Sequence, residues 1–228
     1  MAEFLLALFV FLTLHSIPAI PAIRERLLFL LGRAGYFSLY SFASILALAW
    51  VLYAALDVDH IPLWQPSAWQ AWVTMIAAPV GVFLVLAGLF SVNPLSVSIR
   101  QGQKPGSIVS VTRHPVLWGF AIWALGHLVA NGDVRSLILF GGFALFALGT
   151  IPMIEKRARR RLGDQWQRQS AKTSILPFAA LFTGRTRLSG DTPIATATVA
   201  TAVLTLWLLA GGHAALFYAD PLLLATAQ

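Results

Sequence analysis

The chain has 228 residues, carries a formal net charge of +7 and contains no cysteine. Hydrophobic residues make up 58% of the sequence and charged residues 11%, and the mean hydropathy is +0.75. This composition is too apolar for a soluble domain of this length and predicts an integral membrane protein. The absence of cysteine excludes disulfides, thiolate metal ligands and a cysteine nucleophile.

Six apolar segments reach or approach the roughly 17–25 residues with which a helix crosses a bilayer. Their residues do not alternate between apolar and polar as barrel strands do. The pattern predicts an all-α fold, a polytopic transmembrane helical bundle of about six spans in a single membrane domain over 1–228. The first segment lacks a basic n-region and an A-x-A cleavage site, so we expect it to be retained as the first span. The six segments are residues 3–17, 36–56, 68–90, 115–130, 135–154 and 193–209.

The basic residues sort to one side of this arrangement. Of the sixteen lysines and arginines, only Arg135 falls in a loop on the opposite side. By the positive-inside rule the basic side is the inner side, so six spans place both termini outside. The charge fits topology and attraction to anionic headgroups, which makes membrane lipid an expected partner and nucleic acid an unexpected one.

Residues 154–170, before the last span, carry apolar side chains at helical spacing with arginine and lysine between them. The apolar positions are Ile154, Ala158, Leu162 and Trp166. This pattern predicts a basic amphipathic helix that lies at the inner membrane interface. A solvated basic extension of the fifth span fits the same residues, and the sequence leaves both interpretations open.

Two histidines lie in apolar segments, His15 near the end of the first and His127 within the fourth. At about 1.5 Å per residue, each lies about 18 Å from the start of its segment, the first counted from outside and the fourth from inside. In a hydrocarbon core ~30 Å thick, both then fall near the midplane. Ionisable side chains at this depth usually serve a functional site, and imidazole is the commonest metal ligand. Two imidazoles at one depth can bind a haem iron from opposite sides, and helix-to-helix hydrogen bonding is the alternative.

Residues around the fourth segment offer flat apolar surfaces and space for a porphyrin. Trp118 and Trp123 are expected as apolar walls, and Gly126 is expected to leave room beside them. Arg113 and His114 come just before the segment, where the free N–H groups of a helix start attract anions. They can contact haem propionates or another cofactor carboxylate, and snorkelling of Arg113 to lipid headgroups fits equally well.

Several short motifs resemble the NnrU family of bacterial membrane proteins, which is linked to nitrite and nitric oxide reduction. The motifs are H-S at 15–16, T-R-H-P at 112–115, W-A-L-G-H-L at 123–128 and A-N-G-D at 130–133. The NnrU-like region covers about residues 1–190 and leaves a C-terminal span and tail at 191–228. The resemblance implies a multi-pass protein of the bacterial inner membrane, which with the charge pattern places both termini in the periplasm.

The same family includes plant zeta-carotene isomerase, and K-T-S-I-L-P-F-A-A at 172–180 is similar to the C-terminal region of that enzyme. This resemblance implies haem b as the cofactor, with His15 and His127 as iron ligands and catalytic residues. It also implies haem-dependent cis–trans isomerisation of a hydrophobic polyene. The link to nitrite and nitric oxide reduction implies an alternative, a haem accessory or sensor protein that binds nitric oxide and works with partner redox proteins.

A more distant likeness concerns the isoprenylcysteine carboxyl methyltransferases. Arg113-His114-Pro115 with Gly119, followed by Glu155, resembles the cofactor-binding half of those enzymes. It implies an S-adenosylmethionine-dependent membrane methyltransferase in which Arg113 and His114 contact the cofactor and Glu155 gives polar support. The sequence does not choose between these functions.

Overall fold

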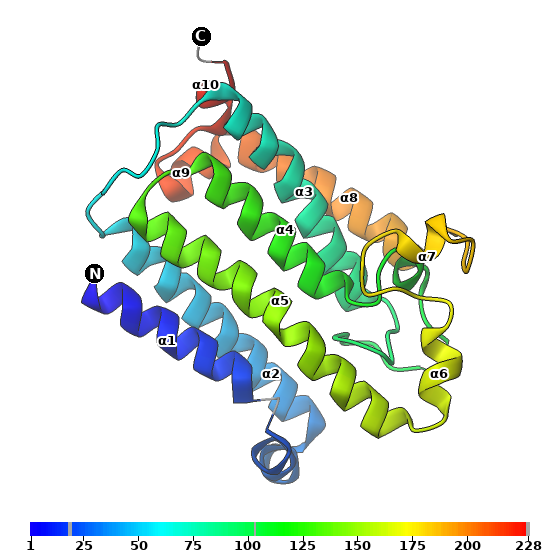
Figure 1. Cartoon of the computed structure of the whole chain (residues 1–228). Helices are drawn as coiled ribbons and strands as arrows, with labels where there is room; N and C mark the ends of the chain where they lie inside the picture. Colours follow the sequence, from blue (N-terminus) through cyan, green and yellow to red (C-terminus); the bar gives the residue numbers. More distant parts are fainter. Residues whose placement is uncertain (18–19, 103, 227–228) are drawn as a thin grey trace. The chain divides into compact units, whose positions relative to one another are not determined.

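The computed structural model describes residues 1–17, 20–102 and 104–226. These residues form helices joined by loops, with two isolated β-bridges and no strand, which confirms the predicted all-α fold. The chain divides into two compact units, Met1–Pro62 with Asp133–Arg135 and Leu63–Gly132 with Ser136–Gln228. Figure 1 labels the helices of both units, and each unit is described by itself.

Four stretches of helix in the described residues are long and apolar enough to cross a membrane. Two further apolar helices, α1 (Ala2–Ser16) and α4 (Pro115–Ala130), have 15 and 16 residues and match the first and fourth predicted segments. All six predicted segments are therefore helical, but only four belong to helices of full spanning length. The long stretches are Ala22–Leu56, Ala68–Phe90, Val134–Leu162 and Thr192–Phe217.

The first unit consists mainly of α1 and α2 (Pro21–Leu56), which pack side by side in opposite directions. Trp50 Nε1 donates a hydrogen bond to Glu3 Oε1 at 3.0 Å, and the ring centroids of His15 and Tyr40 lie 5.8 Å apart. Residues early in α1 thus meet residues late in α2, as an antiparallel pair requires.

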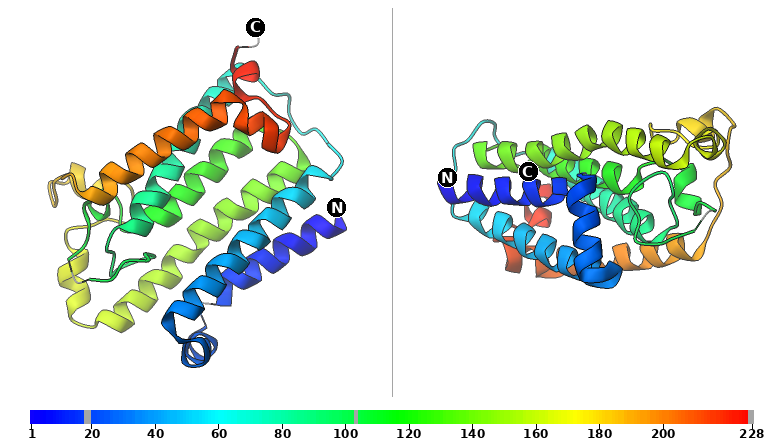
Figure 2. Two further views of the ribbon diagram at one scale, coloured as in Figure 1. Left: turned by 180° about the vertical axis from the view of Figure 1, so that it is seen from behind. Right: turned by 90° about the horizontal axis from the view of Figure 1, so that it is seen from below.

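The helix α2 bends at Gly32, whose φ of 64° and ψ of 173° lie outside the helical region. Glycine adopts a positive φ without the steric cost of a Cβ atom, which explains the position of the bend. The sequence predicts a second span that begins at residue 36, but Arg24, Arg26 and Arg33 already lie within the helix. Arginine is a good helix former, so the charged stretch extends α2 instead of forming a loop. Figure 2 shows the segment before the bend turned away from the rest of α2.

Arg135, the single basic residue predicted on the outer side, closes the end of α2 within the first unit. Its side chain pairs with Asp133 at 3.4 Å and donates hydrogen bonds to the carbonyl oxygens of Ala55, Leu56 and Val58 at 3.3–3.4 Å. The last carbonyls of a helix lack partners within the helix, and a basic side chain satisfies them.

In the second unit, α3 (Ala68–Phe90) and α4 pack closely against each other through glycines. A Cβ atom placed on Gly81 would lie 2.6 Å from the carbonyl oxygen of Gly119, and one on Gly119 would lie 2.5 Å from that of Gly81. One on Gly88 would lie 2.8 Å from Pro115 Cγ. Small residues let helices in membranes approach this closely, since packing rather than water exclusion holds them together. The glycines therefore fix α4 against α3 in antiparallel orientation.

The helix α5 (Val134–Leu162) runs past residue 154, where the fifth span is predicted to end. It is followed by Gly163, with φ of 50°, and by a separate short helix, α6 (Gln165–Ser170). The prediction of one amphipathic helix over 154–170 is therefore wrong. Its first part is the basic extension of α5, because lysine and arginine favour helix and suit the negative end of the helix dipole.

The helix α8 (Thr192–Trp207) packs against α3 and continues beyond residue 209 through a π-helical turn, Leu208–Gly212. Asp191 fixes its start, since one carboxylate oxygen accepts a hydrogen bond from the N–H of Ile194 at 3.0 Å and the other from that of Ser107 at 2.7 Å. The remaining short helices are η2 (Ser107–Ser110), α7 (Ala179–Phe182), α9 (His213–Phe217) and α10 (Pro221–Thr226).

Candidate functional site

Six of the seven predicted site residues lie on α4 or directly before it, and His15 lies on α1. His114 and His127 stand at opposite ends of α4, about 20 Å apart at the usual rise of the helix. The structure therefore separates the predicted residues of the second unit into two groups. We name them the charged cluster, Arg113, His114 and Glu155, and the aromatic cluster, Trp123, His127 and Phe140.

Arg113 lies at the centre of the charged cluster and is buried. Its NH1 group donates a hydrogen bond to Glu155 Oε2 at 2.7 Å, its Nε to Thr173 Oγ1 at 2.8 Å, and its NH2 to the carbonyl oxygen of Ser170 at 3.1 Å. The guanidinium thus joins the start of α4 to α5, to the end of α6 and to the residues that follow α6. Buried charges are tolerated when they are paired and hydrogen-bonded in this way.

His114 is fully buried and uses both of its ring nitrogens. Its Nε2 lies 3.0 Å from Glu155 Oε1 and its Nδ1 lies 2.8 Å from Ser96 Oγ. Because a carboxylate only accepts, Nε2 carries the proton and Nδ1 accepts from the serine hydroxyl. Burial lowers the pKa of His114 below its ordinary value of 6.5, and Glu155 opposes that shift only in part. His114 is therefore a neutral, internally bonded imidazole.

The predicted role of Arg113 and His114 was to meet an anionic group of a cofactor. In the structure, their polar atoms bond to Glu155 and its neighbours, and contact with a cofactor stays a prediction. Trp118, predicted as an apolar wall, donates its indole N–H to the carbonyl oxygen of Ile175 at 2.8 Å. The hydroxyl of Thr112 donates to the same oxygen at 2.9 Å. These bonds hold the 170–177 segment against the start of α4.

His127 belongs to a different environment, formed by aromatic rings. Its ring centroid lies 4.5 Å from that of Trp123 and 5.1 Å from that of Phe140, which stacks on it at 27°. Its Nδ1 lies 2.8 Å from the carbonyl oxygen of Trp123, so Nδ1–H donates and the lone pair stands on Nε2. A ligand histidine typically holds this arrangement, with one ring N–H on a backbone carbonyl and the other nitrogen for the metal.

Gly126 serves the packing of α4 on α3. A Cβ atom at this position would lie 2.6 Å from Ala77 Cβ, and Thr74 Oγ1 donates to the carbonyl oxygen of Gly126 at 2.6 Å. Ala77 of α3 thus lies directly against Gly126, and a place for a porphyrin beside this glycine stays a prediction.

His15, in the first unit, has the same protonation pattern as His127. Its Nδ1 lies 2.9 Å from the carbonyl oxygen of Phe11, so this nitrogen donates and Nε2 holds the lone pair. The Phe11 ring lies 4.1 Å away, centroid to centroid, and restrains the imidazole. In both histidines of the apolar segments, Nε2 is thus the nitrogen with the lone pair, and a lone-pair nitrogen is what a histidine uses to bind haem iron.

A metal held by protein ligands alone has less support. The described residues contain no group of three or more His, Asp or Glu side chains placed to hold a metal ion. A haem needs only one or two ligands from the protein, because the porphyrin supplies the other four. The donor chemistry of His15 and His127 fits that requirement.

Sequence reasoning missed the partners that complete both clusters. Ser96 belongs to no motif, Thr173 was noted only as part of the 172–180 stretch, and Phe140 is one apolar residue among many in its segment. Glu155 was recognised only as polar support in the methyltransferase-like interpretation. One signal was available, since Glu155 is the acidic residue that follows directly on the apolar part of the fifth segment. Ionisable residues in such positions tend to be paired.

The sequence model of the NnrU protein family matches residues 3–221. The chain is similar to the chloroplastic 15-cis-zeta-carotene isomerase of Arabidopsis thaliana, with 27% identity over 199 residues, 82% of this chain and 52% of the relative. It is similar to the chloroplastic 15-cis-zeta-carotene isomerase of Zea mays, with 31% identity over 84 residues, 37% of this chain and 23% of the relative. The chain thus spans about half the length of the Arabidopsis relative. No solved structure matches it.

Proposed function

Because the chain belongs to the NnrU family, we propose that it is a haem b-dependent membrane isomerase that acts on a cis double bond of a hydrophobic polyene. The support for the reaction is the similarity to two proteins named as 15-cis-zeta-carotene isomerases. The support for the cofactor is the tautomer shared by His15 and His127, since each has Nδ1–H on a backbone carbonyl and its lone pair on Nε2. This shared tautomer is the observation that carries the proposal.

In this proposal His15 and His127 would each hold the haem iron through a ring nitrogen, and the haem would supply the chemistry that weakens the π bond of the polyene. Trp123 and Phe140 stack on His127 and fix the direction of its ring. The charged cluster holds the start of α4 in place. The exposed apolar side chains of the long helices suit a substrate that arrives from the lipid phase.

Haem content and turnover test the proposal together. Protein purified in detergent from haem-sufficient cells is expected to show a Soret band and a reduced spectrum of six-coordinate, low-spin haem b. It is expected to convert cis-zeta-carotene at a rate that falls with haem depletion. The matched control is His60→Ala, which changes an exposed loop histidine and should leave spectrum and turnover intact.

The outcomes separate the competing functions. A colourless preparation after haem supplementation would reject the cofactor, and binding of S-adenosylmethionine by that preparation would favour a methyltransferase. Haem without turnover on the polyene, combined with a spectral response to nitric oxide, would favour an accessory or sensor role with redox partners.

The proposed topology has six spans in a bacterial inner membrane, with α1 and α4 crossing as short helices and both termini in the periplasm. It rests on the charge pattern, since Arg135 is the exception among sixteen basic residues. Reporter fusions at the C-terminus and after Arg161 are expected to report periplasm and cytoplasm, respectively. A cytoplasmic C-terminus would reject the six-span arrangement.

A further inference from the structure

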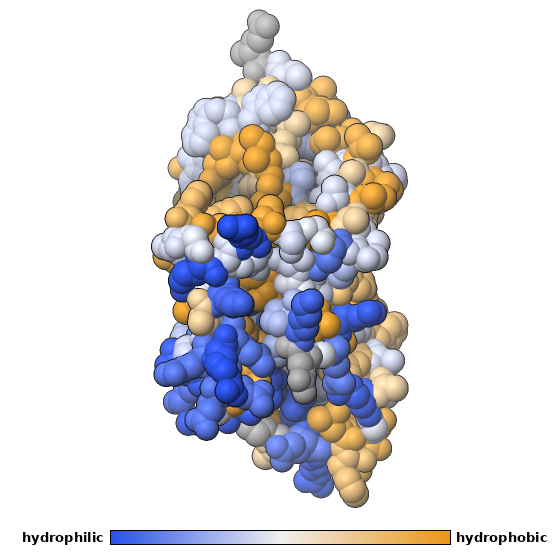
Figure 3. Space-filling model, turned by 90° about the vertical axis from the view of Figure 1, so that its right-hand side faces the viewer, coloured by the Kyte–Doolittle hydropathy of each residue, from blue (hydrophilic) through white to orange (hydrophobic). Residues whose placement is uncertain are grey.

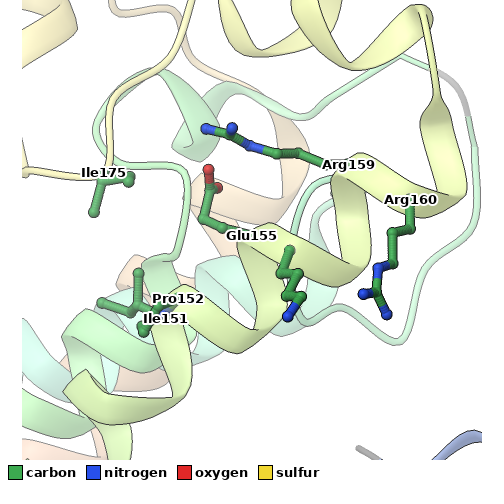
Figure 4. A pocket seen from close by; sticks show the side chains of 7 residues that line it. Ile151, Pro152, Glu155, Arg159, Arg160 and Ile175 are labelled. Carbon is green, nitrogen blue, oxygen red and sulfur yellow. The ribbon is translucent and has the colours of Figure 1, made fainter.

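A pocket of about 580 Å³ opens on the second unit beside the basic end of α5. Figure 4 shows its two kinds of lining, with apolar side chains towards one end and arginines towards the other. The apolar part consists of Ile151, Pro152 and Ile175, and the polar part of Glu155, Lys156, Arg159 and Arg160. The pocket therefore suits a ligand with an apolar body and a charged head.

The charge of the pocket is positive. Lys156, Arg159 and Arg160 are exposed and follow one face of α5 at helical spacing. The carboxylate of Glu155 does not cancel them, because it is already paired with Arg113 at 2.7 Å and is buried. Three cations therefore remain for a ligand, and the ligand that they recognise is an anion.

One of these cations is held in position before any ligand arrives. The guanidinium carbon of Arg159 lies 4.1 Å from the centroid of the Trp166 ring on α6. Arginine stacked on an aromatic ring retains its outward N–H groups, and its planar fork matches phosphate oxygens. The turn at Gly163 brings α6 back towards α5 and so places Trp166 against Arg159.

The pocket lies where a helix of spanning length changes from apolar to basic. The candidate span Val134–Leu162 has its apolar part before Glu155 and its cations after it. Figure 3, which looks at the end of the molecule that carries α6 and α7, shows hydrophilic side chains gathered there. At such a boundary a lipid headgroup meets the cations while its acyl chains remain among apolar side chains.

We propose that this pocket binds one anionic membrane phospholipid. The phosphate contacts Lys156, Arg159 and Arg160, and the first part of an acyl chain lies along Ile151, Pro152 and Ile175. A zwitterionic phospholipid has the same phosphate, but its own cationic group competes for it, so the pocket selects anionic lipids. The site is independent of the proposed haem.

Native mass spectrometry of the detergent-purified protein tests this site with phosphatidylglycerol and phosphatidylcholine as probes. The test variant is Lys156→Gln with Arg159→Gln and Arg160→Gln. The control variant removes the same charge from three exposed cations outside the pocket, as Arg168→Gln, Lys172→Gln and Arg187→Gln. Phosphatidylglycerol retention is expected to fall about tenfold or more in the test variant and less than about twofold in the control. Helical circular dichroism verifies that both variants are folded.

Three results would overturn the site. Equal loss in both variants would mean diffuse attraction to the basic surface, and equal retention of the two phospholipids would mean no anion selectivity. Displacement of phosphatidylglycerol by inorganic phosphate at matched concentration would mean that the pocket binds the free ion and that the apolar wall has no role. Retention of phosphatidylglycerol by a variant with Arg159→Lys and Arg160→Lys, which keeps both charges, would support the site.

Discussion

The two ends of α4 carry histidines with opposite hydrogen-bonding patterns, and the contrast separates a structural role from the proposed ligand role. At the start of the helix, His114 donates from Nε2 to Glu155 and accepts at Nδ1 from Ser96, so both nitrogens serve the fold. Near the other end, His127 donates from Nδ1 to its own helix and keeps its lone pair on Nε2 among aromatic rings. A histidine in the first state holds helices together, and one in the second state is suited to a ligand.

The largest expected effect comes from breaking the charged cluster. Replacing Arg113 with Ala leaves the buried carboxylate of Glu155 without its main partner, and loss of one member of a buried ion pair costs about 3–5 kcal/mol. Thermal unfolding in detergent should show a clearly lower midpoint. Arg168→Ala, which removes an exposed cation, should change stability by less than about 0.5 kcal/mol. A midpoint for Arg113→Ala equal to that of Arg168→Ala would contradict the role assigned to this cluster.

A second variant tests the close packing of α4 on α3. Gly119→Ala places a Cβ atom within 3 Å of Gly81 O and Val85 N, which are backbone atoms that cannot move aside separately. Overpacking of this kind costs about 1–3 kcal/mol. The matched control is Gly149→Ala in α5, where no atom lies within 4 Å of the added Cβ atom and the higher helix propensity of alanine should preserve stability. Equal unfolding midpoints for the two variants would mean that α3 and α4 are less tightly packed than described.

Acid should weaken the charged cluster through His114. Because burial lowers the pKa of this imidazole in the folded protein, the unfolded chain takes up the proton first as pH falls below 6.5. The stabilising contribution is therefore fully present above that pH and is lost as pH falls towards the lowered pKa of the folded state. Unfolding midpoints measured from pH 8 to pH 5 should decline less steeply in His114→Gln than in the unchanged protein. A steeper decline in the variant would mean that His114 stabilises the fold as pH falls, which is the opposite of the effect expected here.

The smallest expected effect on stability comes from His127→Ala. Its hydrogen bond stays within one helix turn, and its loss should cost about 1 kcal/mol, well below the effect of Arg113→Ala. Unfolding midpoints of the two variants, measured side by side in haem-free preparations so that loss of bound haem does not contribute, give the comparison. A larger loss of stability in His127→Ala than in Arg113→Ala would mean that the structural role belongs to the His127 end of α4, contrary to the assignment made here.

Much of the fold could be predicted from the sequence where residues typical of helix starts and turns flank an apolar segment. The predicted segments 68–90 and 115–130 coincide with α3 and α4, whose starts are marked by the Ser67 capping box and by Pro115. The resemblance to the NnrU family is confirmed over nearly the whole chain. One error lies where basic residues were taken as the end of a helix, as at Arg33. Beyond residue 154, a basic extension of the fifth span, one of the two interpretations left open, is what the structure has as far as Leu162. Basic residues continue a helix, and it is the positive φ of Gly32 and Gly163 that bends or ends it.

The candidate site was predictable only in part. His15 and His127 could be recognised because an imidazole in an apolar segment is conspicuous. The charged cluster could not be assembled, since Arg113 and Glu155 are 42 positions apart and meet only when α4 packs beside α5. The role of Gly126 also depends on a neighbour, Ala77, that no local pattern identifies.

Absorption spectra of two variants recorded side by side test the central distinction most directly. In haem-supplemented detergent preparations, His127→Ala should lose or convert the low-spin haem b spectrum, because an axial ligand is missing. His114→Gln, at the other end of the same helix, should retain that spectrum even though its unfolding midpoint is lower. Loss of the spectrum in His114→Gln with full retention in His127→Ala would contradict the assignment of structural and ligand roles to the two ends of α4.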